Sequence, residues 1–165
     1  MATEVPKECG TTMWIDHLAL LAGDPSVKTS FDAVNSGVGS GLSGLIIQSS
    51  TIGDTAQGGG NKVVETAVEV PPGFKVTGVR VCFENSNTRS YINQIRLAQV
   101  QNPPATASVL LDDATKLNAN GPVCVDSQPP ASIDPANGPL LLSLRLYFDS
   151  TADKIVVRGL GLHLS

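Results

Sequence analysis

Hydrophobic and polar residues alternate along much of the chain with the two-residue period of β-strands. In residues 74–84 (FKVTGVRVCFE) the alternation places Val79, Val81 and Phe83 on one face, with glycine, cysteine or charged residues on the other. Residues 62–70 (KVVETAVEV) alternate in the same way. A strand of this kind turns one face toward a core and the other toward water. The pattern therefore predicts half-buried antiparallel strands.

Short apolar or alternating segments recur between turns rich in glycine and proline. Residues 12–21 (TMWIDHLALL) fit either a short helix or a buried strand, because Trp14, Leu18 and Leu21 fall at helical spacing. The remaining strand candidates are residues 45–49, 91–100, 107–111, 122–126, 139–148 and 155–164. Short strands at such intervals favour a sandwich or a barrel.

We therefore expect an all-β fold: a single-domain antiparallel β-sandwich, jelly-roll-like, with eight or nine short strands and at most one short N-terminal helix. The chain has 165 residues, which is long enough to bury a core without disulfides or metals. No break in composition divides it, so residues 1–165 are expected to form one domain, with residues 1–12 as a candidate for a loose N-terminal arm.

The last two strand candidates are apolar on both faces, and residues 139–148 carry leucines at alternate positions. We expect them to form a hairpin in which Asp149 opposes Lys154 and the alternate leucines face the core. The outer face would then carry three leucines ringed by an aromatic and two basic residues: Leu141, Leu160 and Leu162, with Arg145, Tyr147 and Arg158. A one-residue slip in register separates the two arginines but moves Arg158 onto the leucine face. We favour the first register, in which the outer leucines mark a contact with another subunit.

Charged side chains are sparse and mixed in sign, making up 16% of the residues for a net charge of −4. The Lys and Arg residues are scattered, which argues against a nucleic-acid partner and against a polybasic membrane-surface segment. No apolar run is long enough to span a bilayer, and residues 1–10 lack the order of a signal peptide. A cytoplasmic protein is the default expectation, with a secreted or particle-surface role left open.

The glycine-rich stretch at residues 36–50 (SGVGSGLSGLIIQSS) is the segment most similar to a phosphate-binding loop. A phosphate cradle must be followed at once by a helix, whereas here a β-branched apolar run follows Gly44. We therefore interpret the stretch as a loop. The two histidines, His17 and His163, are far apart and match no metal-ligand or nucleophile motif.

Two pairs of aspartates are candidates for calcium ligands, Asp112 with Asp113 and Asp149 with Asp153. Asx turns explain these aspartates more simply, so no cofactor is predicted and calcium stays an alternative. Among three cysteines, Cys82 and Cys124 fall in strand candidates. They are either bridged to one another or buried as free thiols, and their spacing cannot decide between the two.

Residues 85–91 combine asparagine, threonine, Arg89 and Tyr91 in one polar segment. This mixture suits binding of a sugar or a peptide, although a hairpin loop rich in turn-forming residues has the same composition. With no catalytic constellation in view, the leading hypothesis is a non-enzymatic, self-assembling structural, shell or surface component. The alternative is a lectin-like module that binds carbohydrate or another ligand, and an enzyme with a dispersed carboxylate site is the third.

Overall fold

The computed structural model describes residues 10–31, 44–101 and 106–165. Sheet A contains β1 (Thr11–Ile15), β3 (Val27–Ser30), β4 (Leu45–Ser49), β6 (Val76–Asn85), β9 (Val123–Ser127) and β11 (Ile155–Leu164). Sheet B contains β2 (Leu21–Ala22), β5 (Val63–Val68), β7 (Tyr91–Val100), β8 (Ala107–Asp113) and β10 (Leu140–Tyr147). Two 3₁₀ turns, η1 (His17–Ala19) and η2 (Pro135–Asn137), complete the regular structure of the described residues.

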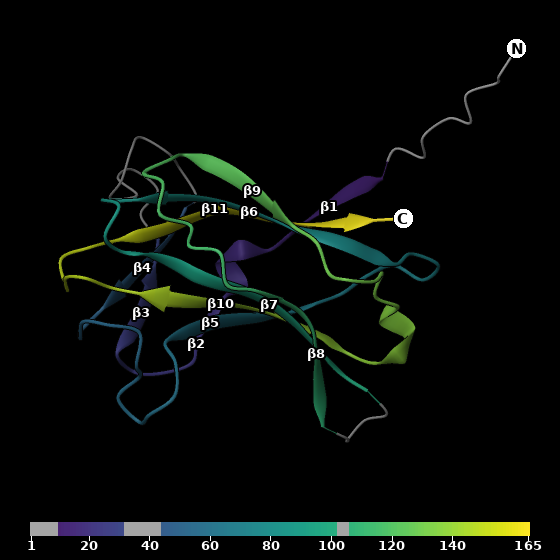
Figure 1. Ribbon diagram of the computed structural model, residues 1–165, viewed down its shortest axis with the longest axis horizontal. Coiled ribbons are helices and arrows are strands. Elements are labelled where there is room, and N and C mark those ends of the chain that lie inside the picture. Colours follow the sequence, from purple (N-terminus) through teal and green to yellow (C-terminus); the bar gives the residue numbers. More distant parts are fainter. Residues whose placement is uncertain (1–9, 32–43, 102–105) are drawn as a thin grey trace, which may run out of the picture.

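The two antiparallel sheets stack as layers, with the edge strands β9 and β8 on the same side of the sandwich (Figure 1). Sheet A has the order β3-β4-β11-β6-β9, and sheet B the order β2-β5-β10-β7-β8. On one edge of β11, β4 pairs with residues 155–157 and β1 with residues 160–164. Successive strands repeatedly change sheet, as they do in a jelly roll. The predicted all-β sandwich is confirmed.

The core lies between the sheets and consists almost entirely of aliphatic side chains. Val79, Val81 and Phe83 of β6 are at most 1% exposed, as their alternation predicted. The alternate leucines of β10 are equally buried, with Leu142 and Leu144 at 0% exposure. Their neighbours along each strand point outward. Because the two sheets stack as layers, the outward residues of each sheet form one of the two opposite outer faces of the sandwich.

Residues 12–21 are mostly extended and contain no α-helix. Thr12 belongs to β1, and the following turn η1 is capped by Asp16, whose carboxylate accepts a hydrogen bond from the amide of Leu18 at 3.0 Å. The described residues form eleven strands rather than eight or nine, because the short β2 and the polar β3 carry too weak an alternation to be recognised. Within the described ranges, no helix is long and apolar enough to cross a membrane.

The predicted hairpin between the last two strands is wrong. β10 pairs with β5 and β7 in sheet B, whereas β11 pairs with β1, β4 and β6 in sheet A. The connection between them therefore crosses from one sheet to the other. Each strand has a complete apolar face, and such faces are buried when they pack against each other across a core. The alternate leucines of β10 are therefore explained by packing across the core, without pairing between β10 and β11.

Leu160 and Leu162 lie in the core at 0% exposure, so their assignment to a subunit interface is also wrong. The cause is a β-bulge between β11 and β6. Positions 157 and 159 pair with consecutive residues of β6, which leaves Arg158 as an extra residue. The bulge shifts the core-facing positions from odd to even numbers, and a strict two-residue period cannot reveal it.

A disulfide joins Cys82 of β6 to Cys124 of β9, with an S–S distance of 2.00 Å. The two residues are directly opposed in the strand register. Because β9 is the last strand of sheet A, the bridge attaches this edge strand to its neighbour β6. Cys9 and residues 36–43 of the glycine-rich stretch lie outside the described residues.

Candidate functional site

A groove of about 310 Å³ crosses the outer face of sheet B. The alternation that buries the leucines of β10 turns Ser143 and Arg145 outward, and the strand register places Ser143 between Glu65 of β5 and Arg96 of β7. The polar lining of the groove consists of Asn61, Glu65, Gln94, Arg96, Ser143 and Arg145, and its apolar lining includes Ala98, Val109 and Leu141. All of these side chains except Asn61 stand on strands of sheet B.

Protein contacts hold two polar groups of the groove in fixed positions. Arg145 donates through Nη2 to Oδ2 of Asp54 at 2.6 Å, with about a third of each side chain exposed. The hydroxyl of Ser143 donates to Oε1 of Glu65 at 2.5 Å. The second oxygen of Glu65 and the other terminal N–H groups of Arg145 can bind hydroxyl groups of a ligand, whereas Nε of Arg145 is buried.

The other basic residue of the groove is held from β8. Nη2 of Arg96 lies 3.3 Å from Oδ2 of Asp112, and the side-chain amide of Gln94 donates to the same carboxylate. Both arginines are therefore paired with aspartates at the rim of the groove. The local charge is nearly balanced, which disfavours a strongly anionic or cationic ligand.

Two stacked tyrosines continue the same face beyond Arg145. The rings of Tyr91 and Tyr147 are 5.0 Å apart between centroids and inclined by 19°, and the ammonium of Lys116 lies 5.2 Å from the ring centre of Tyr91. Tyr91 and Tyr147 are direct partners in the pairing of β7 with β10. The pair supplies an amphipathic wall with flat apolar faces and hydroxyl groups.

The structure brings together four of the eight ligand or interface residues named from the sequence: Tyr91, Leu141, Arg145 and Tyr147. Arg89 lies in the loop before β7 and pairs with Asp149 at 3.3 Å. Arg158 lies on sheet A, where its guanidinium binds the buried carboxylate of Glu84 at 2.7 Å. Neither arginine lines the groove, and the two remaining leucines are core residues.

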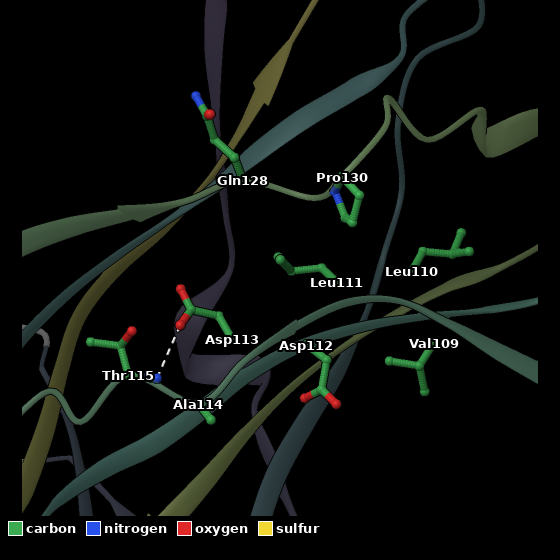
Figure 2. A pocket seen from close by; sticks show the side chains of 9 residues that line it. All are labelled: Val109, Leu110, Leu111, Asp112, Asp113, Ala114, Thr115, Gln128 and Pro130. Carbon is green, nitrogen blue, oxygen red and sulfur yellow. Dashed lines mark hydrogen bonds between the residues drawn. The ribbon is translucent and has the colours of Figure 1, made fainter.

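A second cavity, of about 620 Å³, opens at the side of the sandwich between β8 and the segment that follows β9 (Figure 2). Asp113 is engaged there by the hydroxyl of Ser127 at 2.5 Å and by the amide of Thr115 at 3.0 Å. The hydrogen bond from Ser127, followed by that from Thr115, lowers the pKa of Asp113. Because Ser127 and Thr115 already donate hydrogen bonds to this carboxylate, we infer that Asp113 stabilises the edge of the sandwich and does not bind a ligand.

The aspartates considered as calcium ligands do not converge. Asp112 points to Arg96 and Gln94, whereas its neighbour Asp113 points to Ser127. Asp153 is buried and accepts hydrogen bonds from Asn87 and Ser90. In the part of the chain that the structure describes, no group of three or more His, Cys, Asp or Glu residues is arranged to hold a metal ion.

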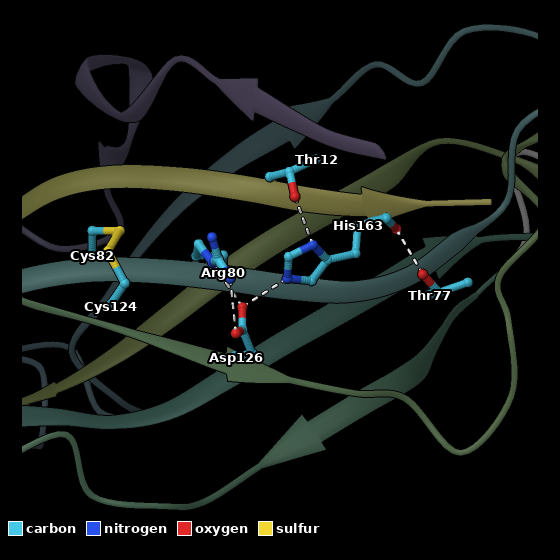
Figure 3. Close-up of polar contacts among 7 residues, drawn as sticks. All are labelled: Thr12, Thr77, Arg80, Cys82, Cys124, Asp126 and His163. Carbon is cyan, nitrogen blue, oxygen red and sulfur yellow. Dashed lines mark hydrogen bonds and ion pairs between the residues drawn. A yellow bond between two sulfur atoms is a disulfide. The ribbon is translucent and has the colours of Figure 1, made fainter. Parts of the chain in front are cut away.

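The outer face of sheet A carries a chain of polar side chains from four strands (Figure 3). His163 of β11 contacts the hydroxyl of Thr12 through Nδ1 at 2.9 Å and Oδ1 of Asp126 through Nε2 at 2.7 Å. Arg80 holds the same carboxylate with two hydrogen bonds of 2.9 and 3.1 Å. The hydrogen bonds from Arg80 and then His163 lower the pKa of Asp126 to about 2.

This hydroxyl, imidazole and carboxylate have the composition of a nucleophile triad but lack its electrostatics. In a catalytic triad the carboxylate stabilises the imidazolium that forms when the hydroxyl attacks. Here the charge of Asp126 is already neutralised by Arg80, and none of the cavities described above is lined by Thr12 or His163. No local sequence pattern signals this cluster, because Thr12 and His163 are 151 residues apart.

The chain matches no protein-family model and no curated protein sequence. Solved structures match its fold. The CBM22-1–GH10 modules of Clostridium thermocellum xylanase 10B, solved with xylohexaose, align over 94% of this chain and 28% of that chain, with a TM-score of 0.57 at 9% identity. The CBM22-1 xylan-binding domain of Paenibacillus barcinonensis Xyn10C aligns over 88% of this chain and 85% of that chain, with a TM-score of 0.55 at 11% identity.

A third structure, a xylan-binding domain from CBM22, aligns over 94% of this chain and 96% of that chain, with a TM-score of 0.51 at 12% identity. Identities this low establish a common fold alone. The chain therefore has the β-sandwich architecture found in carbohydrate-binding modules.

Proposed function

We propose that this chain is a non-catalytic carbohydrate-binding module that takes a neutral oligosaccharide in the groove of sheet B. The observation that carries the proposal is the composition of the groove on a sandwich of this type. Glu65, Ser143 and Arg145 are held in place by protein contacts, and a tyrosine wall continues their face. Sugar recognition needs such a set: fixed donors and acceptors for hydroxyl groups, beside flat apolar surface for C–H groups.

The groove favours binding over hydrolysis. Glycoside hydrolysis ordinarily requires two carboxyl groups that flank the scissile bond. Glu65 is the one carboxylate among the residues that line the groove, and its near oxygen already accepts the hydroxyl of Ser143. The two aspartates at the rim, Asp54 and Asp112, are each held by an arginine, so neither is poised to act with Glu65 as an acid and base pair.

Ligand binding is also favoured over self-assembly as a structural component. Assembly through the last two strands would need apolar residues exposed on them, whereas Leu160 and Leu162 are core residues. We further propose an oxidising compartment for this chain, because disulfides such as Cys82–Cys124 persist outside reducing environments.

Affinity electrophoresis through gels that contain soluble xylan, glucan or mannan tests the function. The wild-type chain is expected to be retarded by at least one polysaccharide. Glu65→Gln and Arg145→Met are each expected to weaken binding by roughly tenfold, because each removes a hydrogen bond to a charged group. Glu69→Gln and Arg89→Met, which change the same residue types outside the groove, should migrate like wild type. Unaltered migration of the wild-type chain in all three gels contradicts the proposal.

A further inference from the structure

Trp14 lies on the outer face of sheet A, on the opposite side of the sandwich from the groove, and the residue is 59% exposed. It is the single tryptophan of the chain. Its direct partner on β11 is Gly161. A Cβ atom built on Gly161 would lie 3.4 Å from Cε3 of the indole, and one built on Gly159 would lie 3.4 Å from Cζ3. The indole therefore lies against the bare backbone of two glycines.

Glycine weakens a strand interior and often marks a place where another group approaches the backbone closely. Here that group is an aromatic ring that remains open to solvent. Any larger side chain at position 159 or 161 would meet the ring at van der Waals distance and limit how closely it can lie on the sheet. The two glycines thus leave room for the indole ring beside the backbone of β11, while the residue stays exposed.

Polar groups follow in register from the indole across the sheet. Gly161 pairs with Arg80 of β6, and Arg80 pairs with Asp126 of β9. At about 4.8 Å between neighbouring strands, this row spans about 14 Å from β1 to β9. The next row places His163 beside Thr12, and Figure 3 shows the imidazole between Thr12 and Asp126. The surface thus combines one aromatic face with a rim of hydrogen-bonding groups.

The rim is both ordered and accessible. Each polar side chain is held by its neighbour, through contacts of 2.9 Å between Thr12 and His163 and 2.7 Å between His163 and Asp126. The side chains of Arg80 and Asp126 nevertheless keep 35% and 48% of their surface exposed. Side chains that are already ordered lose little conformational entropy when a ligand binds.

We propose that this surface, defined by Thr12, Trp14, Arg80, Asp126 and His163, is a second carbohydrate site, independent of the groove. The C–H face of a sugar ring packs on the indole, and its hydroxyl groups bind the carboxylate, guanidinium and imidazole of the rim. The ligand is an uncharged oligosaccharide, because Arg80 and Asp126 neutralise one another. A sugar fits this surface because the apolar area is narrow: it consists of one aromatic ring, which is bordered by two glycines and by polar side chains.

Intrinsic fluorescence tests this site in the wild-type chain. Trp14 is the only tryptophan, and the aromatic residues beside the groove are tyrosines, so excitation at the red edge of the spectrum reports on this surface alone. We would titrate the chain with xylohexaose, cellohexaose and mannohexaose. At least one sugar is expected to shift the emission to shorter wavelength and to lower the acrylamide quenching constant about twofold. No change with all three sugars overturns the proposal.

Two variants separate this site from the groove. The Glu65→Gln/Arg145→Met chain should keep the full response of Trp14, because the groove is not involved. Arg80→Gln should weaken the fluorescence-detected affinity about tenfold, whereas Arg96→Gln in the groove should leave it within twofold. Loss of the response in the groove variant, or an unchanged affinity in Arg80→Gln, contradicts the second site. If the groove binds nothing and Trp14 still responds, the second site stands and the proposed function of the groove fails.

Discussion

The ammonium group of Lys62 lies 2.6 Å from the carbonyl oxygen of Thr51, on a lysine that is fully buried. The carbonyl oxygens of Ile52 and Gly53 are each 3.2 Å from the same nitrogen. Burial lowers the pKa of Lys62, and the nearby charges of Asp54 and Asp24 act in the opposite direction. One side chain thus organises the turn after β4, from which Asp54 reaches Arg145 of the groove.

Lys62→Met should therefore destabilise the fold, although it removes a buried charge. Methionine fills a similar volume but leaves inward-pointing carbonyl groups without their donor, a loss of about 1–3 kcal/mol in the free energy of unfolding. Urea denaturation measures this change. Lys28→Met, at an exposed position of β3, is the control and should change stability by less than about 0.5 kcal/mol. Equal stability of the two variants would show that the carbonyl groups do not depend on Lys62.

Leu162→Asp should prevent folding. The side chain is 0% exposed in the core, and aspartate there would be a buried charge without a partner. Leu141→Asp provides the comparison, because Leu141 is only partly buried on the outer face of β10. Circular dichroism should show β structure for the Leu141→Asp chain but not for the Leu162→Asp chain. A folded Leu162→Asp chain would place this residue on a surface and restore the interface hypothesis.

Acid should weaken the contribution of Asp126 to stability. Its pKa is lowered from 3.8 to about 2, chiefly by Arg80 and then by His163. A carboxylate with a lowered pKa stabilises the folded state above its ordinary pKa, and this stabilisation is lost as the pH falls through the lowered value. Asp126→Asn should thus be less stable than wild type near neutral pH, and the difference should shrink between about pH 4 and pH 2.

Denaturation midpoints measured across this pH range test the assignment. Arg80→Met removes the principal cause of the shift and should reduce the same acid-dependent loss of stability. Added salt should reduce the difference as well, because the ion pair is half-exposed. A stability difference between Asp126→Asn and wild type that stays constant down to pH 2 would contradict the assignment.

Reduction of the Cys82–Cys124 disulfide should lower the free energy of unfolding by about 2–4 kcal/mol, because the bridge closes a loop between residues 42 positions apart. The double variant Cys82→Ala/Cys124→Ala should match the reduced wild-type chain. Equilibrium denaturation with and without a reductant makes the measurement. The second carbohydrate site should weaken in parallel, since the bridge holds β9, and with it Asp126, beside β6. If reduction leaves stability unchanged, the bridge is not a support of this sheet.

Much of the fold follows from local alternation. The two-residue period of β6 and β10 by itself predicts which residues face the core, and Val79, Val81, Phe83 and the alternate leucines of β10 are buried as predicted. The sheet to which each strand belongs was not predictable in this way. β10 and β11 carry similar apolar faces whether they pair side by side or pack across the core, and the bulge at Arg158 has no local signature.

The candidate sites were predictable only where a single strand carries several of the site residues. Arg145, Tyr147 and Leu141 share the outer face of β10, so the sequence placed them together even though the proposed partner strand was wrong. The cluster on sheet A depends on contacts between Thr12 and His163, and between Arg80 and Asp126, that join distant parts of the chain. Trp14 belongs to residues 12–21, which fit either a helix or a strand, so the sequence could not predict that it is exposed.

The most direct test of the proposed function is to map a bound oligosaccharide by amide correlation spectra of the isotope-labelled wild-type chain. Xylohexaose, cellohexaose and mannohexaose would each be titrated to saturation or to the limit of solubility. At least one sugar is expected to shift a continuous set of amides around Glu65, Gln94, Ser143 and Arg145. The Glu65→Gln/Arg145→Met chain is expected to lose these shifts at equal ligand concentration. Spectra in which no sugar perturbs the outer face of sheet B would contradict carbohydrate binding in the groove.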